Sequence, residues 1–108
     1  MKERNEFYNK GHDAGYKADE LINEVDMMPY QPEYQIGYVV GYADQVGVAN
    51  ADQGYAGTVI AELTKKYDLP EKIMRQEVKD YKDDEMLRAF DIKMETGEDE
   101  FDESFEDD

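Results

Sequence analysis

The sequence predicts an all-α protein, a small bundle of four to five helices followed by a disordered acidic C-terminal tail. Apolar residues recur every three or four positions through residues 1–94, as on the inner face of amphipathic helices, and no stretch shows the period of two that a strand requires. From residue 95 onward the chain is mostly acidic. We therefore expect a helical domain at 1–94 and a tail at 95–108.

The first helix is expected from about Asn5 to Val25. Its small and apolar residues form one stripe, made up of Phe7, Gly11, Ala14, Ala18, Leu21 and Val25. The segment "MMPYQP" ends this helix, because Pro29 and Pro32 lack amide donors and push the preceding residue out of the helical conformation.

A second helix is expected to begin near Pro32 or Glu33, where the missing donor of a proline costs no hydrogen bond. Residues 34–43 contain no charge, so this helix offers no obvious solvent face and is expected to be central. Gly47 is expected to end it.

Asn50 or Asp52 is expected to cap a third helix, which runs to about Tyr67. Asp68 is then a candidate cap and Pro70 an early residue of a fourth helix. The residues expected to face inward from the third helix are Val59, Ile60, Leu63 and Tyr67. Those of the fourth are Ile73, Met74, Val78 and Tyr81, and the pattern resumes with Met86, Leu87, Phe90 and Met94.

Two segments share the frame G-x-x-x-G-Y, "GHDAGY" at 11–16 and "GYVVGY" at 37–42. A phosphate-binding loop would follow a strand and carry a lysine at a fixed place, and neither segment does. A spacing of four instead places both glycines of each segment on one helix face, which allows close packing. The predicted helix-packing residues are Gly11, Gly15, Gly37, Gly41, Tyr38 and Tyr42.

The chain has 108 residues, of which 12 are basic and 28 acidic, for a net charge of −16. This charge repels nucleic acid and anionic membranes, so we expect a basic, nucleic-acid-binding protein as partner and no direct contact with nucleic acid or membrane. There is no cysteine, and the longest uncharged apolar run, 36–43, is too short to cross a bilayer. We expect a soluble, cytoplasmic protein.

Two interpretations of the acidic end stay open: it promotes solubility, or it docks a basic groove by imitating a nucleic-acid backbone. Exposed ion pairs contribute about 0.2–1 kcal/mol each, so charge alone would steer a partner, and affinity would need apolar anchors or the acidic face of the folded domain. The predicted partner-binding residues are Asp83, Asp84, Glu85, Asp91, Glu95, Glu98, Asp99, Glu100, Phe101, Asp102, Glu103, Phe105 and Glu106.

No catalytic, cofactor-binding or metal-binding residues are predicted. His12 is the only histidine, and we expect it to be exposed or bonded within its own helix. A pocket that gathered His12 with Asp13 and a tyrosine would instead favour an enzyme.

The motifs "KGHDAGYKA", "YQIGYVVGYA" and "AGTVIAELTKKYDLPEKIM" follow one another in an order that resembles a small uncharacterised enterobacterial helical family. The resemblance covers about residues 9–78 and implies no activity, because the family has none assigned. The chain departs from the family pattern at Asp68, where a glycine is expected, and in its acidic extension. Its composition is also similar to that of bacteriophage DNA-mimic inhibitors.

The leading hypothesis is a non-enzymatic inhibitor that occupies the nucleic-acid site of a basic partner. The alternative is a helical adaptor, or a homo-oligomer such as a homodimer formed through the glycine and tyrosine faces, with a solvating tail. Loss of partner binding on deletion of 95–108 would favour the first hypothesis.

Overall fold

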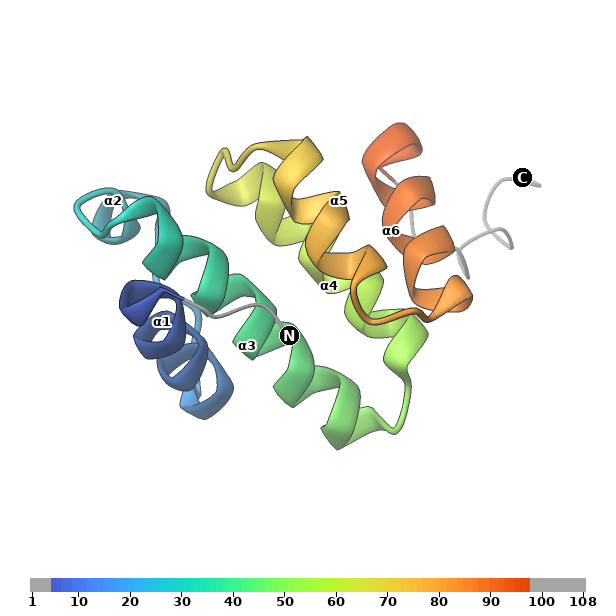
Figure 1. Cartoon of the computed structure of the whole chain (residues 1–108), viewed down its shortest axis with the longest axis horizontal. Helices are drawn as coiled ribbons and strands as arrows, with labels where there is room; N and C mark the ends of the chain where they lie inside the picture. Colours follow the sequence, from blue (N-terminus) through green and yellow to red (C-terminus); the bar gives the residue numbers. More distant parts are fainter. Residues whose placement is uncertain (1–4, 98–108) are drawn as a thin grey trace.

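Six helices make up the part of the chain that the structure describes, residues 5–97 of a computed structural model (Figure 1). They are α1 (Glu6–Lys17), α2 (Glu24–Met27), α3 (Pro32–Asn50), α4 (Gln53–Lys66), α5 (Glu71–Lys79) and α6 (Asp84–Thr96). α1 packs on α3, and α4 contacts α3, α5 and α6, so α3 and α4 lie in the middle of the bundle. The described residues include no strand, which confirms the all-α prediction.

The contact between α1 and α3 is built on the glycines of the two repeated motifs. A Cβ atom on any of the four would come closer than 3.0 Å to backbone of the facing helix. The atoms met are the carbonyl oxygens of Tyr34 for Gly11, Tyr38 for Gly15, Tyr8 for Gly37 and His12 for Gly41. Tyr38 is buried, and Tyr42 is partly buried against the core. The close approach of the two backbones offsets the intrinsic cost of glycine within a helix.

The predicted first helix, Asn5–Val25, is wrong in its second half. α1 ends at Lys17, and residues 18–23 form a connection before α2. Side chains of the central helices satisfy the backbone there: Tyr38 Oη accepts from Ile22 N at 3.1 Å, and Tyr67 Oη donates to the Ile22 carbonyl at 2.5 Å. These tertiary bonds replace the hydrogen bonds that a continued helix would make.

The predicted inner stripe of the first helix is also wrong at its two ends. Phe7 is 43% exposed and Val25 is 72% exposed. Tyr8 takes the inward position next to Phe7 and is buried. The helix face is therefore set by Tyr8, Gly11 and Gly15, which occupy one side of α1.

The connection between α3 and α4 differs from expectation at one end. α3 begins at Pro32, as predicted, but it continues past Gly47 to Asn50, and Ala51 ends it in the left-handed region with φ 53°. Gly47 is buried beside α4. The predicted cap Asp52 is confirmed, because its side chain accepts from Tyr55 N at 3.1 Å.

The sequence predicted Asp68 as the cap of α5, and this is wrong, because Pro70 is the N-cap residue. Asp68 instead has a φ of 55°, and its amide donates to the Lys65 carbonyl at 3.2 Å in the last turn of α4. This is the left-handed position that glycine adopts most readily at a helix C-terminus.

The predicted inward residues of α4 are all buried: Val59, Ile60, Leu63 and Tyr67. Met74, Val78, Met86 and Phe90 are buried as well, whereas Ile73 is 47% exposed, contrary to expectation. Gly57 of α4 packs on the Met86 carbonyl of α6, a close approach that the sequence analysis did not single out.

α6 continues through Glu95 and Thr96, two residues that the sequence analysis assigned to the tail. The expected disorder at 98–108 lies outside the described residues. Within the described part, none of the helices is long and apolar enough to cross a bilayer.

Candidate functional site

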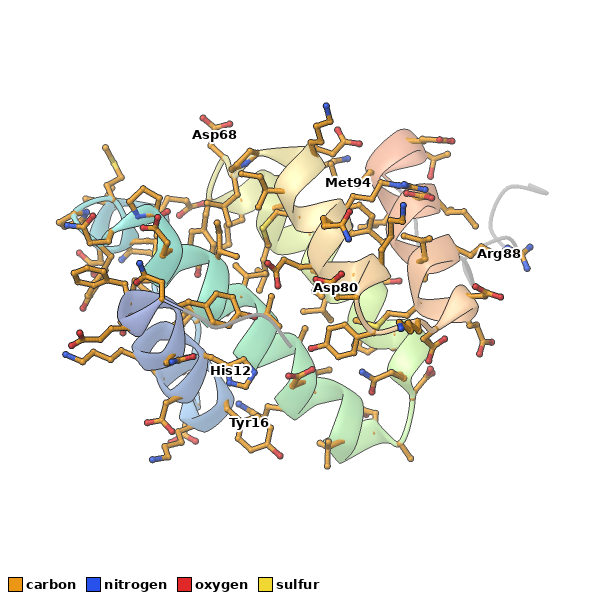
Figure 2. All side chains as sticks on the ribbon, viewed as in Figure 1. His12, Tyr16, Asp68, Asp80, Arg88 and Met94 are labelled. Carbon is orange, nitrogen blue, oxygen red and sulfur yellow. The ribbon has the colours of Figure 1, made fainter. Side chains whose placement is uncertain are left out.

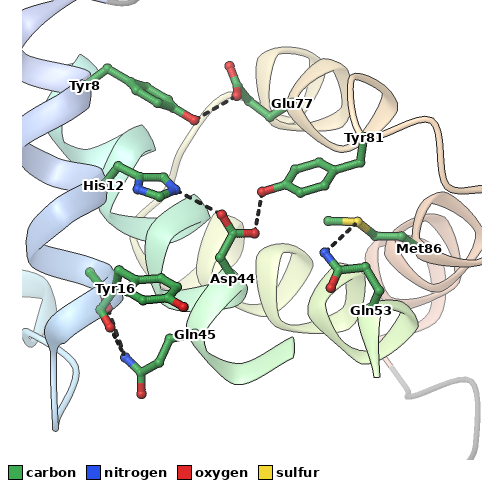
Figure 3. Close-up of polar contacts among 10 residues, drawn as sticks. Tyr8, His12, Tyr16, Asp44, Gln45, Gln53, Glu77, Tyr81 and Met86 are labelled. Atoms are coloured by element: carbon green, nitrogen blue, oxygen red, sulfur yellow. Dashed lines mark hydrogen bonds and ion pairs between the residues drawn. The ribbon is translucent and has the colours of Figure 1, made fainter. Parts of the chain in front are cut away.

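Five polar side chains from α1, α3, α5 and the turn after α5 meet at one place, the His12 cluster (Figure 3). His12 Nε2 lies 2.9 Å from Asp44 Oδ2, and the hydroxyl of Tyr81 donates to Asp44 Oδ1 at 2.5 Å. Beside them, the Tyr8 hydroxyl donates to Glu77 Oε1 at 3.2 Å. The cluster thus joins α1 and α3 to the α5 side of the bundle.

Asp44 is the acceptor that organises the cluster. Its two oxygens have different partners, since Oδ1 accepts from the Tyr81 hydroxyl and Oδ2 pairs with His12 Nε2. Burial, reinforced by the hydrogen bond to Asp44, raises the pKa of Tyr81. Tyr81 therefore stays a neutral donor to Asp44 at physiological pH.

An open pocket of about 380 Å³ adjoins the cluster. Its lining residues are Tyr8, Asn9, His12, Val40, Glu77, Asp80 and Tyr81. Tyrosine rings beside carboxylates suit a cationic group, because the ring faces attract positive charge and the carboxylates accept charged hydrogen bonds. The pocket is therefore chemically fitted to a lysine or arginine side chain.

A second pocket, of about 400 Å³, also adjoins His12 and is lined by Asn9, His12, Asp13 and Tyr16. His12 and Tyr16 extend from the same side of α1 (Figure 2), with their ring centroids 6.4 Å apart. This is the combination that the sequence analysis named as favouring an enzyme. Asp13, however, pairs with Lys17 at 3.2 Å, and the partner of His12 is Asp44.

His12 is partly exposed and its ring stacks on Tyr8 and Tyr16 of its own helix, as expected, but its hydrogen-bond partner, Asp44, lies on α3. The described residues lining the two pockets include no serine, threonine or cysteine that His12 would activate as a nucleophile.

The predicted partner-binding carboxylates of the α6 region fall into two groups. Asp83 caps α6 by accepting from Met86 N at 3.1 Å, and Asp91 accepts two hydrogen bonds from Arg75, each 2.8 Å long. These two serve the fold. The exposed members are Asp84, Glu85 and Glu95. The other predicted residues lie outside the described range: Glu98, Asp99, Glu100, Phe101, Asp102, Glu103, Phe105 and Glu106.

The acid excess of the described part lies mainly on the α1–α3 half. Residues 5–52 contain nine acidic and two basic residues, whereas residues 53–97 contain ten and eight. Between Lys17 and Lys65 there are eight acidic residues and no basic one. Seven of the eight are exposed: Asp19, Glu20, Glu24, Asp26, Glu33, Asp52 and Glu62. We call these seven residues the acidic surface; three of them also serve the fold, since Glu24 pairs with Lys66, Glu62 pairs with Lys93 and Asp52 caps α4.

Sequence reasoning missed Asp44 as the partner of His12, and Tyr81 as a donor to Asp44. One signal was present, since Asp44 is the only charged residue in 34–50, and a lone charge within an uncharged helix calls for a specific partner. The partner itself lies 32 positions away from Asp44 along the chain, beyond any local pattern. In residues 5–97, no group of three or more histidine, aspartate or glutamate side chains is arranged to hold a metal ion.

The chain was compared with protein families, curated proteins and solved structures. Residues 3–95 match the family described as protein of unknown function DUF2623. No curated protein and no solved structure matches the chain. Since the match spans most of the 108 residues, the chain belongs to the DUF2623 family.

Proposed function

We propose that this protein is a small binding protein whose acidic surface docks a basic surface of a partner protein. The observation that carries the proposal is the run from Lys17 to Lys65, which presents seven exposed carboxylates and no basic residue. An excess of exposed carboxylates attracts a basic partner and speeds its association.

The pocket beside the His12 cluster supports the same proposal. It offers Tyr8, Tyr81, Glu77 and Asp80 to a lysine or arginine side chain on the partner. One such anchored side chain would supply the short-range affinity that exposed carboxylates lack, because exposed ion pairs contribute about 1 kcal/mol or less each.

A nucleic-acid mimic is the narrower form of this proposal. In that form, the basic surface is the partner's own nucleic-acid site, so DNA or RNA and this protein would bind the partner in competition. The net charge of −16 supports the narrower form through composition.

The glycines lend no support to the alternative of a homo-oligomer formed through the glycine and tyrosine faces. Gly11, Gly15, Gly37 and Gly41 are all covered within the chain by the contact of α1 with α3. An adaptor or oligomer would have to use another surface.

The test is affinity purification of the full chain from a lysate of the organism that makes it, eluted with a salt gradient. A first variant neutralises four residues of the acidic surface: Asp19→Asn, Glu20→Gln, Asp26→Asn and Glu33→Gln. A matched control removes four charges elsewhere: Glu71→Gln, Asp84→Asn, Glu85→Gln and Glu95→Gln. All eight side chains are exposed, so both variants are expected to fold.

We expect a partner that elutes below half-molar salt, is lost by the first variant and is retained by the control. A partner retained equally by both variants at half-molar salt would refute the proposal. Displacement by added duplex DNA would favour the mimic, and retention in its presence would favour a partner surface unrelated to nucleic acid.

A further inference from the structure

Three exposed apolar side chains lie on α2 and in the turn that follows it, at one end of the long axis of the bundle (Figure 1). Val25 is 72% exposed, Met28 74% and Tyr30 43%. We call these three residues the α2 corner. Apolar side chains this exposed and this close together in a chain are typical of a docking surface.

The backbone of the α2 corner is firmly held, so fraying does not account for the exposure. Met27 of α2 is buried in the core, which fixes α2 on the bundle. The side chain of Asn23 caps α2 by accepting from Asp26 N at 2.8 Å. The ring of Tyr30 stacks on Tyr34 with the centroids 4.3 Å apart. The corner therefore presents a preformed surface, which lowers the entropy cost of binding.

Carboxylates of the acidic surface flank the α2 corner. Glu24 and Asp26 are the chain neighbours of Val25, and Glu33 lies three residues after Tyr30; all three are exposed. Glu24 pairs with Lys66 at 3.5 Å. Asp26 and Glu33 form none of the salt bridges found among the described residues. An apolar centre with a negative rim is complementary to an apolar stripe flanked by positive charge.

A pocket of about 360 Å³ continues the α2 corner toward α4. Met27, Met28 and Tyr67 supply its apolar walls. Its polar lining is Gln35, Asp68 and the ion pair of Glu24 with Lys66, so Asp68 is the carboxylate there that is outside that pair. Methionine side chains adapt their shape to different apolar groups, so this pocket suits a single bulky side chain from a partner.

We propose that the α2 corner docks a basic amphipathic helix of the partner protein. The apolar stripe of that helix packs on Val25, Met28 and Tyr30, one of its side chains enters the pocket beside Met28, and its lysine or arginine residues face Asp26 and Glu33. The inference rests on the proposed function and names the kind of segment that the acidic surface recognises.

Charge decides between this occupant and two others. An anionic membrane would be repelled by the carboxylates beside Val25. A second copy of the chain would bring the same negative rim against itself, because symmetric contacts pair a surface with its own copy. A basic segment satisfies both the apolar centre and the acidic rim.

The test is a titration of the isotope-labelled full chain, followed by its amide NMR shifts, with a synthetic amphipathic helical peptide of leucine and lysine. A peptide of the same composition in scrambled order is the control for charge alone. We expect saturable shifts centred on residues 24–35 and binding at least about fivefold weaker for the scrambled peptide.

The protein variants are Val25→Ser, Met28→Ser and, as a matched control, Val48→Ser. Val48, near the end of α3, is 67% exposed. It is therefore about as exposed as Val25 but lies outside the α2 corner. Val25→Ser and Met28→Ser together are expected to weaken peptide binding about tenfold, and Val48→Ser to leave it unchanged.

Equal effects of the Val25 and Val48 substitutions, or shifts centred on α6, would overturn the inference while leaving the proposed function intact. Failure of both peptides to bind at low salt would overturn the inference as well. The proposed function would fall only with the lysate experiment, through a partner insensitive to salt and to the first charge variant.

Discussion

Gly37→Ala is the sharpest test of how the bundle is assembled. The new Cβ would meet the carbonyl oxygen of Tyr8, which is backbone and cannot rotate away. Alanine gains about 1 kcal/mol over glycine within a helix, whereas forcing extra atoms into a tight contact costs about 1–3 kcal/mol. Because separating α1 from α3 also loosens Gly11 and its neighbours, we place the cost at the upper end and expect a net destabilisation of about 2 kcal/mol.

The assay is urea unfolding followed by far-ultraviolet circular dichroism. With a urea dependence of about 1–2 kcal/mol/M for a small domain, the midpoint should fall by about 1–2 M. Gly54→Ala is the matched control, because a Cβ there meets only side-chain atoms at 3.4 Å or beyond. We expect that variant to be as stable as the parent or slightly more so. A Gly37→Ala midpoint equal to that of Gly54→Ala would refute the close packing of α1 on α3.

Four further predictions concern stability and the rate of association. Tyr81→Phe removes the hydrogen bond to Asp44 and should lower the free energy of unfolding by about 1 kcal/mol; an unchanged urea midpoint would contradict this. Asp68→Gly relieves a left-handed backbone and should raise that free energy by up to about 1 kcal/mol, which a lower midpoint would disprove. Burial raises the pKa of Tyr67 and Tyr81 above the ordinary value of 10.0, so their contribution to stability is complete below pH 10 and is lost as the pH rises further, because the unfolded chain then releases protons that the folded chain keeps. A tyrosinate absorbance titration in which all tyrosines ionise together would count against it. Truncation after Gly97 removes eight carboxylates and should slow association with a basic partner at low salt while leaving the dissociation rate unchanged; stopped-flow kinetics would show an altered dissociation rate if the tail forms lasting contacts.

The helices that sequence reasoning placed well are those whose signals are local. Asp52 caps α4 through its own side chain, and Pro32 opens α3, because both effects act within one turn of the residue itself. The four glycines were assigned to packing from their spacing, and the structure places them in the contact of α1 with α3. What the spacing could not give was the partner atom that each glycine meets.

Residues 18–23 are not helical, contrary to the prediction, because side chains distant in the sequence bond this part of the backbone. Ala18, Leu21 and Val25 continue the helical period, and nothing local forbids it. The chain leaves the helix because Tyr38, Gln45 and Tyr67, all distant in sequence, bond its backbone: the Gln45 side chain alone donates to the carbonyls of residues 15, 16 and 18. Such bonds exist only after α3 and α4 are in place.

The candidate site divides in the same way. The acidity of the protein follows from its composition. Composition does not show that Asp83 caps α6 and that Asp91 pairs with Arg75, so it could not show which carboxylates the fold itself uses. The His12 cluster joins residues up to 69 positions apart, as in the hydrogen bond from Tyr8 to Glu77, so no local motif could predict it.

The most direct test of the account is the salt dependence of binding between the purified partner and this protein. Isothermal titration at several salt concentrations would compare the parent with the variant neutralised at Asp19, Glu20, Asp26 and Glu33 and with its matched control. We predict that the parent and the control weaken steeply and in parallel as salt rises, and that the first variant binds more weakly at low salt with a shallower slope. Three lines that coincide, or binding by the parent that does not change with salt, would contradict the claim that the acidic surface docks a basic partner.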